Sequence, residues 1–158
     1  MIYLGSDHGG FTLKNKIMEW LKEWGYESTD LGNKANDPQD DYSVFALLVA
    51  QKVGQGEESG NKYPSPWEKR DKGILLCRSA AGMVIAANKV KNVRAVAVFD
   101  SESAKHCRLH NDANIIALSG DWTDDIKAKV ILKVWLETEF SGEERHNRRL
   151  KYISDFEK

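Results

Sequence analysis

The stretch Gly73-Ile74-Leu75-Leu76-Cys77 carries the strongest indication of how this chain folds. It has no charged side chain, which is typical of a strand that is buried on both faces of a sheet. The turn Arg78-Ser-Ala-Ala-Gly82 and a predicted helix over about 81–90 follow it directly. A buried strand that leads through a short turn into a helix is the repeating unit of a parallel sheet.

Similar units lie on both sides of this stretch. Further strands are predicted at 2–5, 27–31, 93–99 and 115–118. Helices are predicted over 11–24, 42–53 and 101–110, and after Thr123, which we expect to be an N-cap. The alternation predicts a single α/β domain over residues 1–158. Its architecture would be doubly wound and Rossmann-like, with a five-stranded parallel sheet between two helical layers.

The predicted helix over 11–24 has a clear two-sided pattern. Leu13, Ile17, Leu21 and Trp24 recur at intervals of three or four residues, so they are expected to face the core. Lys14 is one of several charged residues assigned to the other face, and we expect it in solvent.

Two segments depart from the alternation of strands and helices. Residues 54–71 contain glycines, prolines and many charges, and they are predicted to form an atypical loop insertion without regular structure. Its aromatic residues Tyr63 and Trp67 suggest that the loop docks on the domain. A C-terminal helical tail from about residue 143 is locally basic.

Composition excludes several classes of protein. The 158 residues are 41% hydrophobic and 30% charged with a net charge of −1, which argues against disorder, a membrane protein and a nucleic-acid partner. The N-terminus resembles a strand and not a signal peptide. Cys77 and Cys107 form no C-x-x-C motif, so we expect neither a zinc site nor a disulfide framework. This use of cysteine predicts a cytoplasmic location.

Polar residues cluster where the predicted strands end. Ser6-Asp7-His8 follows the first strand, Cys77-Arg78-Ser79 follows the third, and His110-Asn111-Asp112 precedes the fifth. Open α/β sheets bind ligands beyond the carboxyl ends of their strands. The chain has no G-x-G-x-x-G or Walker motif, which argues against a dinucleotide or a nucleoside triphosphate as ligand.

Cys77 admits two interpretations. A buried cysteine commonly only fills space in a core. Alternatively, its position before a turn and a helix start favours a thiolate that could act as a base, beside backbone N–H groups that could hold an oxyanion.

The histidines and the basic tail are also open to two interpretations each. His110 could be a helix cap or a catalyst, and its spacing from His106 only weakly suggests a metal. Arg145 and Arg149 are spaced to share a helix face, as either a solvated surface or a phosphate clamp.

Several motifs, taken in order, resemble one family. They are Gly5-Ser-Asp-His-Gly-Gly-Phe11, Gly73-Ile-Leu-Leu-Cys77, Ala86-Ala-Asn-Lys-Val90, His110-Asn-Asp-Ala-Asn114 and Leu136-Glu-Thr-Glu-Phe140 with Arg145, His146 and Arg149. The pattern resembles the ribose-5-phosphate isomerase B and galactose-6-phosphate isomerase family over nearly the whole chain except 54–71.

The resemblance implies an aldose–ketose isomerase that needs neither metal nor cofactor. The implied reaction converts ribose 5-phosphate to ribulose 5-phosphate through a cis-enediolate. Alternatives are a hexose 6-phosphate substrate, such as galactose or allose 6-phosphate, or a catalytically silent sugar-phosphate-binding or subunit protein. The family also implies a homodimer or a tetramer with active sites shared between subunits.

The resemblance also implies roles for individual residues. Cys77 would be the base, His110 and Ser79 would assist ring opening, and Asp7 would lie near the sugar hydroxyls. The residues implied in binding substrate, its phosphate or the enediolate are His8, Arg145, Arg149, Tyr42, Asn88, Asn111, Arg78 and Gly82.

The turn after Cys77 departs from the family pattern. Arg78 and Ala80 replace glycines of the family, and Ser79 replaces a threonine. Glycine allows positive φ and close approach of a ligand to the backbone, which the replacements make costlier. Arg78 could point inward to Cys77 or outward to acidic residues of 54–71, and we expect the inward orientation.

Overall fold

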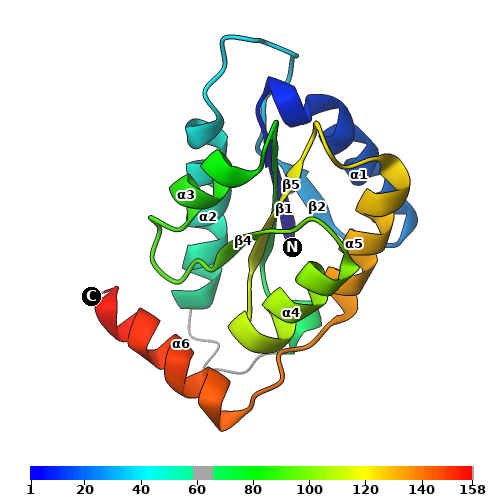
Figure 1. The fold of residues 1–158 in the computed structure, drawn as a ribbon. Coiled ribbons are helices and arrows are strands. Elements are labelled where there is room, and N and C mark those ends of the chain that lie inside the picture. Colours follow the sequence, from blue (N-terminus) through cyan, green and yellow to red (C-terminus); the bar gives the residue numbers. More distant parts are fainter. Residues whose placement is uncertain (59–65, 158) are drawn as a thin grey trace.

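The computed structural model describes residues 1–58 and 66–157, and in these residues a five-stranded parallel sheet has the order β2-β1-β3-β5-β4 (Figure 1). The strands are β1 (Ile2–Ser6), β2 (Ser28–Asp30), β3 (Lys72–Cys77), β4 (Ala95–Ala97) and β5 (Ile115–Ser119). The helices are η1 (His8–Gly10), α1 (Phe11–Glu23), α2 (Tyr42–Glu58), η2 (Trp67–Lys69), α3 (Ala81–Ala87), α4 (Ser101–Asn111), α5 (Asp125–Glu137) and α6 (Glu144–Phe156). The predicted three-layer α/β fold is therefore confirmed.

The side chains of β3 determine where the two halves of the core lie. Ile74 and Leu76 join the core under α1, α4 and α5, whereas Leu75 and Cys77 join the core under α2 and α3 (Figure 1). Alternate residues of a strand point to opposite faces of a sheet, so one strand contributes to both cores. Since β3 pairs with β1 on one side and β5 on the other, its backbone is also fully paired.

The edge strands are shorter than predicted. β2 covers only 28–30 of the predicted 27–31, and β4 only 95–97 of the predicted 93–99. Each edge strand pairs with a single neighbour, and only the residues in that one ladder count as strand.

The predicted N-cap of α5 was wrong by one residue. Asp124 is the cap, because its carboxylate accepts the Lys127 N–H at 2.8 Å, and Thr123 is buried before it. A carboxylate at this position also interacts favourably with the positive end of the helix dipole.

Lys14 is not in solvent as expected. Its side chain is fully buried, and its Nζ lies 2.9 Å from Asp30 Oδ2 and 2.6 Å from the Asn33 carbonyl oxygen. Burial of a charge is tolerated when it is paired and hydrogen-bonded. Trp20, and not Trp24 as predicted, is the tryptophan of α1 that is buried in the core. Trp24 packs against that core but stays partly exposed.

The prediction that 54–71 is entirely irregular was wrong at its start, and near its end Trp67–Lys69 form the short helix η2. Helix α2 continues to Glu58, and a Cβ at Gly54 would lie 2.6 Å from the Lys91 carbonyl oxygen. The glycine therefore allows close packing and does not end the helix. Tyr63 and the rest of 59–65 lie outside the described residues. Trp67 docks as expected, because it is buried and its Nε1 donates to the Trp135 carbonyl at 3.2 Å.

A buried charge cluster lies between the end of α4 and the start of β5, at the opposite edge of the sheet from Cys77. The carboxylate of Asp112 is fully buried and contacts Arg70 at 2.8 Å, Arg94 at 2.8 Å and Arg108 at 2.9 Å. Arg108 also stacks on Trp67, with its Cζ 3.5 Å from the ring centroid. Burial opposes ionisation of Asp112, but the hydrogen bond from Arg70 and the neighbouring cations outweigh it and hold the pKa below its ordinary value.

We expect Asp112→Asn to destabilise the fold by about 3–5 kcal/mol, because it leaves buried guanidinium groups without their carboxylate. The measurement is urea unfolding, with Asp155→Asn as control because Asp155 forms an exposed pair with Lys151 on α6.

The lowered pKa of Asp112 also gives a pH dependence. Its stabilisation is present above the pKa that the carboxyl has in the unfolded chain, and it is lost as pH falls through the lower folded value. The variant should therefore lose less stability than the original chain in acid. Equal stability of variant and original chain at neutral pH would contradict the assignment.

Candidate active site

The ends of β1 and β3 bring two of the predicted motifs together. Ser6 pairs with Leu76 in the sheet, and the Asp7 N–H donates to the Leu76 carbonyl at 3.3 Å. Gly10 permits this approach, since a Cβ there would lie 2.7 Å from the carbonyl of Leu76. The Asp7-His8 pair and Cys77 therefore share the carboxyl edge of the sheet.

Cys77 leads directly into a strained turn. It is free and buried, and Ala80 at the start of α3 has φ of 69°. This is the position where the family pattern has a glycine, and a left-handed conformation costs an alanine roughly 1–2 kcal/mol. Helix α3 begins at Ala81, directly after this turn, so its first backbone N–H groups lie near the same edge as Cys77. Within the described residues no side-chain hydrogen bond caps this helix start.

Tyr42 and Gly82 also lie at the carboxyl edge. Tyr42 begins α2, and a Cβ added at Gly82 would lie 2.7 Å from its ring. A larger residue at position 82 would displace the tyrosine. Ser79 is partly buried in the turn between Cys77 and α3.

Arg78 does not adopt the inward orientation that we expected. Its side chain is 69% exposed, and its Nε donates to Asp121 Oδ2 at 3.0 Å. Asp121 lies after β5, so the partner of Arg78 is also not one of the acidic residues of 54–71 that the outward alternative named. Arg78 packs against Gly9, where a Cβ would lie 2.9 Å from its backbone nitrogen. Its guanidinium thus lies at the rim of this edge.

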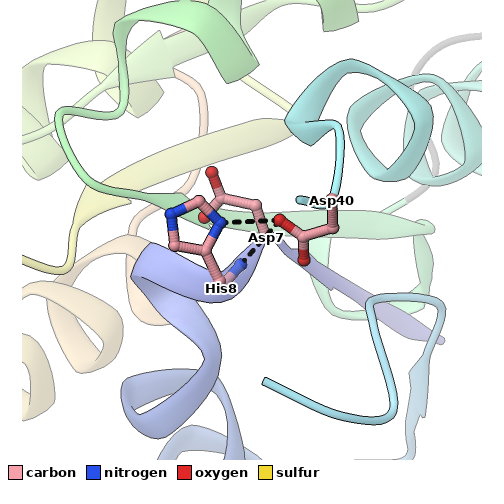
Figure 2. A group of neighbouring side chains, drawn as sticks. All are labelled: Asp7, His8 and Asp40. Atoms are coloured by element: carbon pink, nitrogen blue, oxygen red, sulfur yellow. Dashed lines mark hydrogen bonds and ion pairs between the residues drawn. The ribbon is translucent and has the colours of Figure 1, made fainter. Parts of the chain in front are cut away.

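His8 has a partner that the sequence did not reveal. Its Nδ1 lies 2.7 Å from Asp40 Oδ1, and its backbone N–H donates to the same oxygen at 3.1 Å (Figure 2). The hydrogen bond to Asp40 raises the pKa of His8, and burial raises the pKa of Asp7. Ligand atoms of Asp7, His8 and Asp40 lie within 4.8 Å of one another, a spacing that could surround a metal ion, but Nδ1 and Oδ1 already bind each other.

A second group of predicted residues lies at the opposite, amino edge. His110 and Asn111 end α4 shortly before β5 begins, and Ile115 of β5 pairs with Gly73 at the start of β3. Gly73 and Cys77 are four residues apart along one strand, or about 13 Å. Within one chain, His110 and Cys77 therefore lie at opposite edges of the sheet.

Asn88 also belongs to the amino edge. It follows α3, and its side-chain amide accepts the Ala95 N–H at 2.8 Å and donates to the Ala95 carbonyl at 2.9 Å. Both hydrogen-bonding groups of the amide thus hold the start of β4. Asn88, Asn111, Leu150 and other residues line a groove of about 330 Å³ between β4 and α6.

The imidazole of His110 is held between two others. It stacks on His146 of α6 at a centroid distance of 4.5 Å, and His106 lies edge-on at 4.8 Å. Burial, aided by the neighbouring His110 and Arg145, lowers the pKa of His146, which favours its neutral form. Arg145 and Arg149 are exposed on the same helix, and Arg145 pairs with Glu143 at 2.8 Å.

Comparison with known proteins shows the family. The model described as Ribose/Galactose Isomerase matches residues 2–153. The chain belongs to the Ribose/Galactose Isomerase family. A putative sugar phosphate isomerase, YwlF, of Bacillus subtilis is 40% identical, with 99% of this chain and 96% of that protein covered. A probable ribose-5-phosphate isomerase B of Mycoplasma genitalium is 38% identical over 99% of this chain and 95% of that protein.

Solved structures of the family agree with the fold. Ribose-5-phosphate isomerase B of Clostridium thermocellum matches with a TM-score of 0.87 at 40% identity, over 99% of this chain and 96% of that one. The Mycoplasma genitalium enzyme, solved with bound ribulose-5-phosphate, matches with a TM-score of 0.89 at 38% identity, over 99% and 95%. The family resemblance predicted from the motifs is confirmed.

We expect Gly10→Ala to destabilise the protein by about 1–3 kcal/mol, because the added Cβ would overlap the backbone of Leu76. Thermal unfolding measures the change. Thr12→Ala, two residues further along on the exposed face of α1, is the control and should alter stability by less than about 0.5 kcal/mol. A Gly10→Ala protein as stable as the control would contradict the close approach.

Proposed function

We propose that this protein interconverts ribose 5-phosphate and ribulose 5-phosphate through a cis-enediolate. The observation that carries the proposal is the position of Cys77, beside Asp7 and His8 and directly before the uncapped start of α3. Family membership supports the same reaction, because the Mycoplasma genitalium relative is described with bound ribulose-5-phosphate.

The reaction is balanced within the substrate. After ring opening, the thiolate of Cys77 removes the proton from C2, and the electron pair forms the C1–C2 double bond of the enediolate. The proton returns to C1 while a proton moves from O2 to O1, so no oxidant or reductant is needed. N–H groups at the start of α3 would donate to the enediolate oxygens.

The other thiol is unsuited to this role. Burial raises the pKa of Cys107 to about 12, and its Sγ donates to the Ala104 carbonyl at 3.1 Å. A thiol with such a pKa supplies almost no thiolate near neutral pH.

The remaining roles divide between the two edges of the sheet. Asp7 would hold sugar hydroxyls, Ser79 would assist ring opening, and His8 and Arg78 would meet the phosphate end beside Tyr42 and Gly82. His110 would assist ring opening, Arg145 and Arg149 would bind phosphate, and Asn88 and Asn111 would line the site.

We propose that a homodimer completes the active site. His110 lies about 13 Å or more from Cys77 along the sheet within one chain, which is too far to share a substrate. Two copies related by a twofold axis can set the amino edge of one against the carboxyl edge of the other. The pairing would give two identical sites per dimer.

We expect Cys77→Ala to lower kcat by about 10²–10⁴-fold with ribose 5-phosphate, as loss of a general base does. Cys107→Ala, which removes the other thiol, is the control and should keep most of the activity. Galactose 6-phosphate and allose 6-phosphate are assayed in parallel, and faster turnover of either would reassign the substrate. Binding of all three sugars without turnover by the original chain would select the silent alternative.

Mixing two inactive variants tests the shared site directly. Cys77→Ala and His110→Ala chains, co-expressed with different tags, should each be inactive alone. Random pairing makes about half of the dimers mixed, and each of these has one intact site, so about a quarter of the original activity should return. No recovery, with mixed dimers demonstrated by double affinity purification, would place Cys77 and His110 in separate functions.

A further inference from the structure

We propose that Asp40 is a positioning residue that fixes the ring orientation and charge of His8, so that Nε2 presents an N–H to the phosphate of the substrate. This inference rests on the proposed function and assigns a role to a residue that the sequence motifs do not include. Asp40 lies on the loop between β2 and α2, far from His8 in the sequence.

The geometry leaves one arrangement of the imidazole proton. An ionised carboxylate only accepts hydrogen bonds, so the nitrogen 2.7 Å from Asp40 Oδ1 must be the donor and Nδ1 must carry a proton. The same oxygen accepts the backbone N–H of His8 at 3.1 Å, which fixes the residue at a second point. Figure 2 shows the other ring nitrogen pointing away from Asp40.

The two side chains of the pair differ in how far they are exposed to solvent. The Asp40 side chain is 8% exposed, whereas that of His8 is 30% exposed. The accessible part of the pair is therefore the imidazole, and the carboxylate lies behind it. This order suits a histidine that meets an external anion.

Asp40 is itself held by a chain of buried polar groups. Its Oδ2 accepts from Asn33 Nδ2 at 2.5 Å, and Asn33 Oδ1 accepts from the Ser6 hydroxyl at 3.3 Å. The Asn33 carbonyl accepts from Lys14 Nζ at 2.6 Å. The buried Lys14 thus anchors the loop that carries Asp40, which explains why a lysine occupies the core side of α1.

The groups that face His8 favour a positive ring. The hydrogen bond to Asp40 is the main cause of the raised pKa of His8, and the charge of Asp7 raises this pKa further. Burial lowers the pKa, and so does the charge of Arg78, which is itself paired with Asp121. A raised pKa keeps the imidazolium present to higher pH, and the charge is lost as pH rises through that value. Phosphate, a dianion near neutral pH, would then meet a charged N–H donor.

The test compares Asp40→Asn with Asp37→Asn, which removes the same charge from the same loop. Asp37 is exposed, and its carboxylate accepts the Gln39 N–H, so it is a matched control. In Asp40→Asn we expect the KM for ribose 5-phosphate at pH about 7.5 to rise roughly tenfold, as loss of one charge-assisted contact does. The kcat should change by less than about twofold, and Asp37→Asn should match the original enzyme.

The pH profile distinguishes positioning from a general loss of structure. KM should begin to rise at a lower pH in Asp40→Asn than in the original enzyme. NMR titration of the histidine rings, with His8 assigned by its absence in His8→Gln, should show the same downward shift of the His8 midpoint. An unchanged His8 midpoint, or a fall in kcat without a rise in KM, would overturn the inference.

A phosphate titration tests the role of Asp40 independently of the proposed function. If no sugar phosphate is turned over, the proposed function fails, but inorganic phosphate should still shift the His8 ring signals more in the original protein than in Asp40→Asn. If Asp40→Asn does not fold, ¹⁵N spectra of the original protein decide, because protonation of Nε2 alone above the His8 midpoint would overturn the assignment. A proton retained on Nδ1 there would support it.

Discussion

The burial of β3 on both faces is the constraint on which the rest of the structure depends. Its alternate side chains enter two separate cores, and both of its edges are paired, so no part of the strand can shift without exposing apolar surface. The ends of the strand are therefore the places where polar chemistry can lie. Cys77 ends it at one edge of the sheet, and Lys72 begins it at the other.

The length of that strand also separates the proposed site residues into two groups. His110 with His146 is at one edge and Cys77 with Asp7 and His8 is at the other, because α4 runs antiparallel to the strands and returns its end to the amino edge. A reaction that needs both groups needs a second chain. Because the helices between parallel strands run antiparallel to them, residues at the end of a helix lie at the opposite edge of the sheet from residues at the end of a strand.

Sequence patterns predicted the architecture because strands and helices have distinct apolar periods, and each strand was found with errors only at its ends. They failed where an unusual residue is stabilised by partners distant in sequence. The burial of Lys14 depends on Asp30, the outward orientation of Arg78 depends on Asp121, and the contact of His8 depends on Asp40. Periodicity describes one segment at a time and contains no information on such pairs.

The same dependence on distant partners occurs at both edges of the sheet. At the carboxyl edge, buried Lys14 holds the loop whose carboxylate meets His8. At the amino edge Asp112, next to Asn111, is held by Arg70 from the segment before β3. Buried ion pairs give little net stability compared with apolar packing, but they permit few alternative arrangements. His8, a proposed site residue, is oriented by its contacts with Asp40 before any substrate arrives, so less binding free energy would be lost in ordering it.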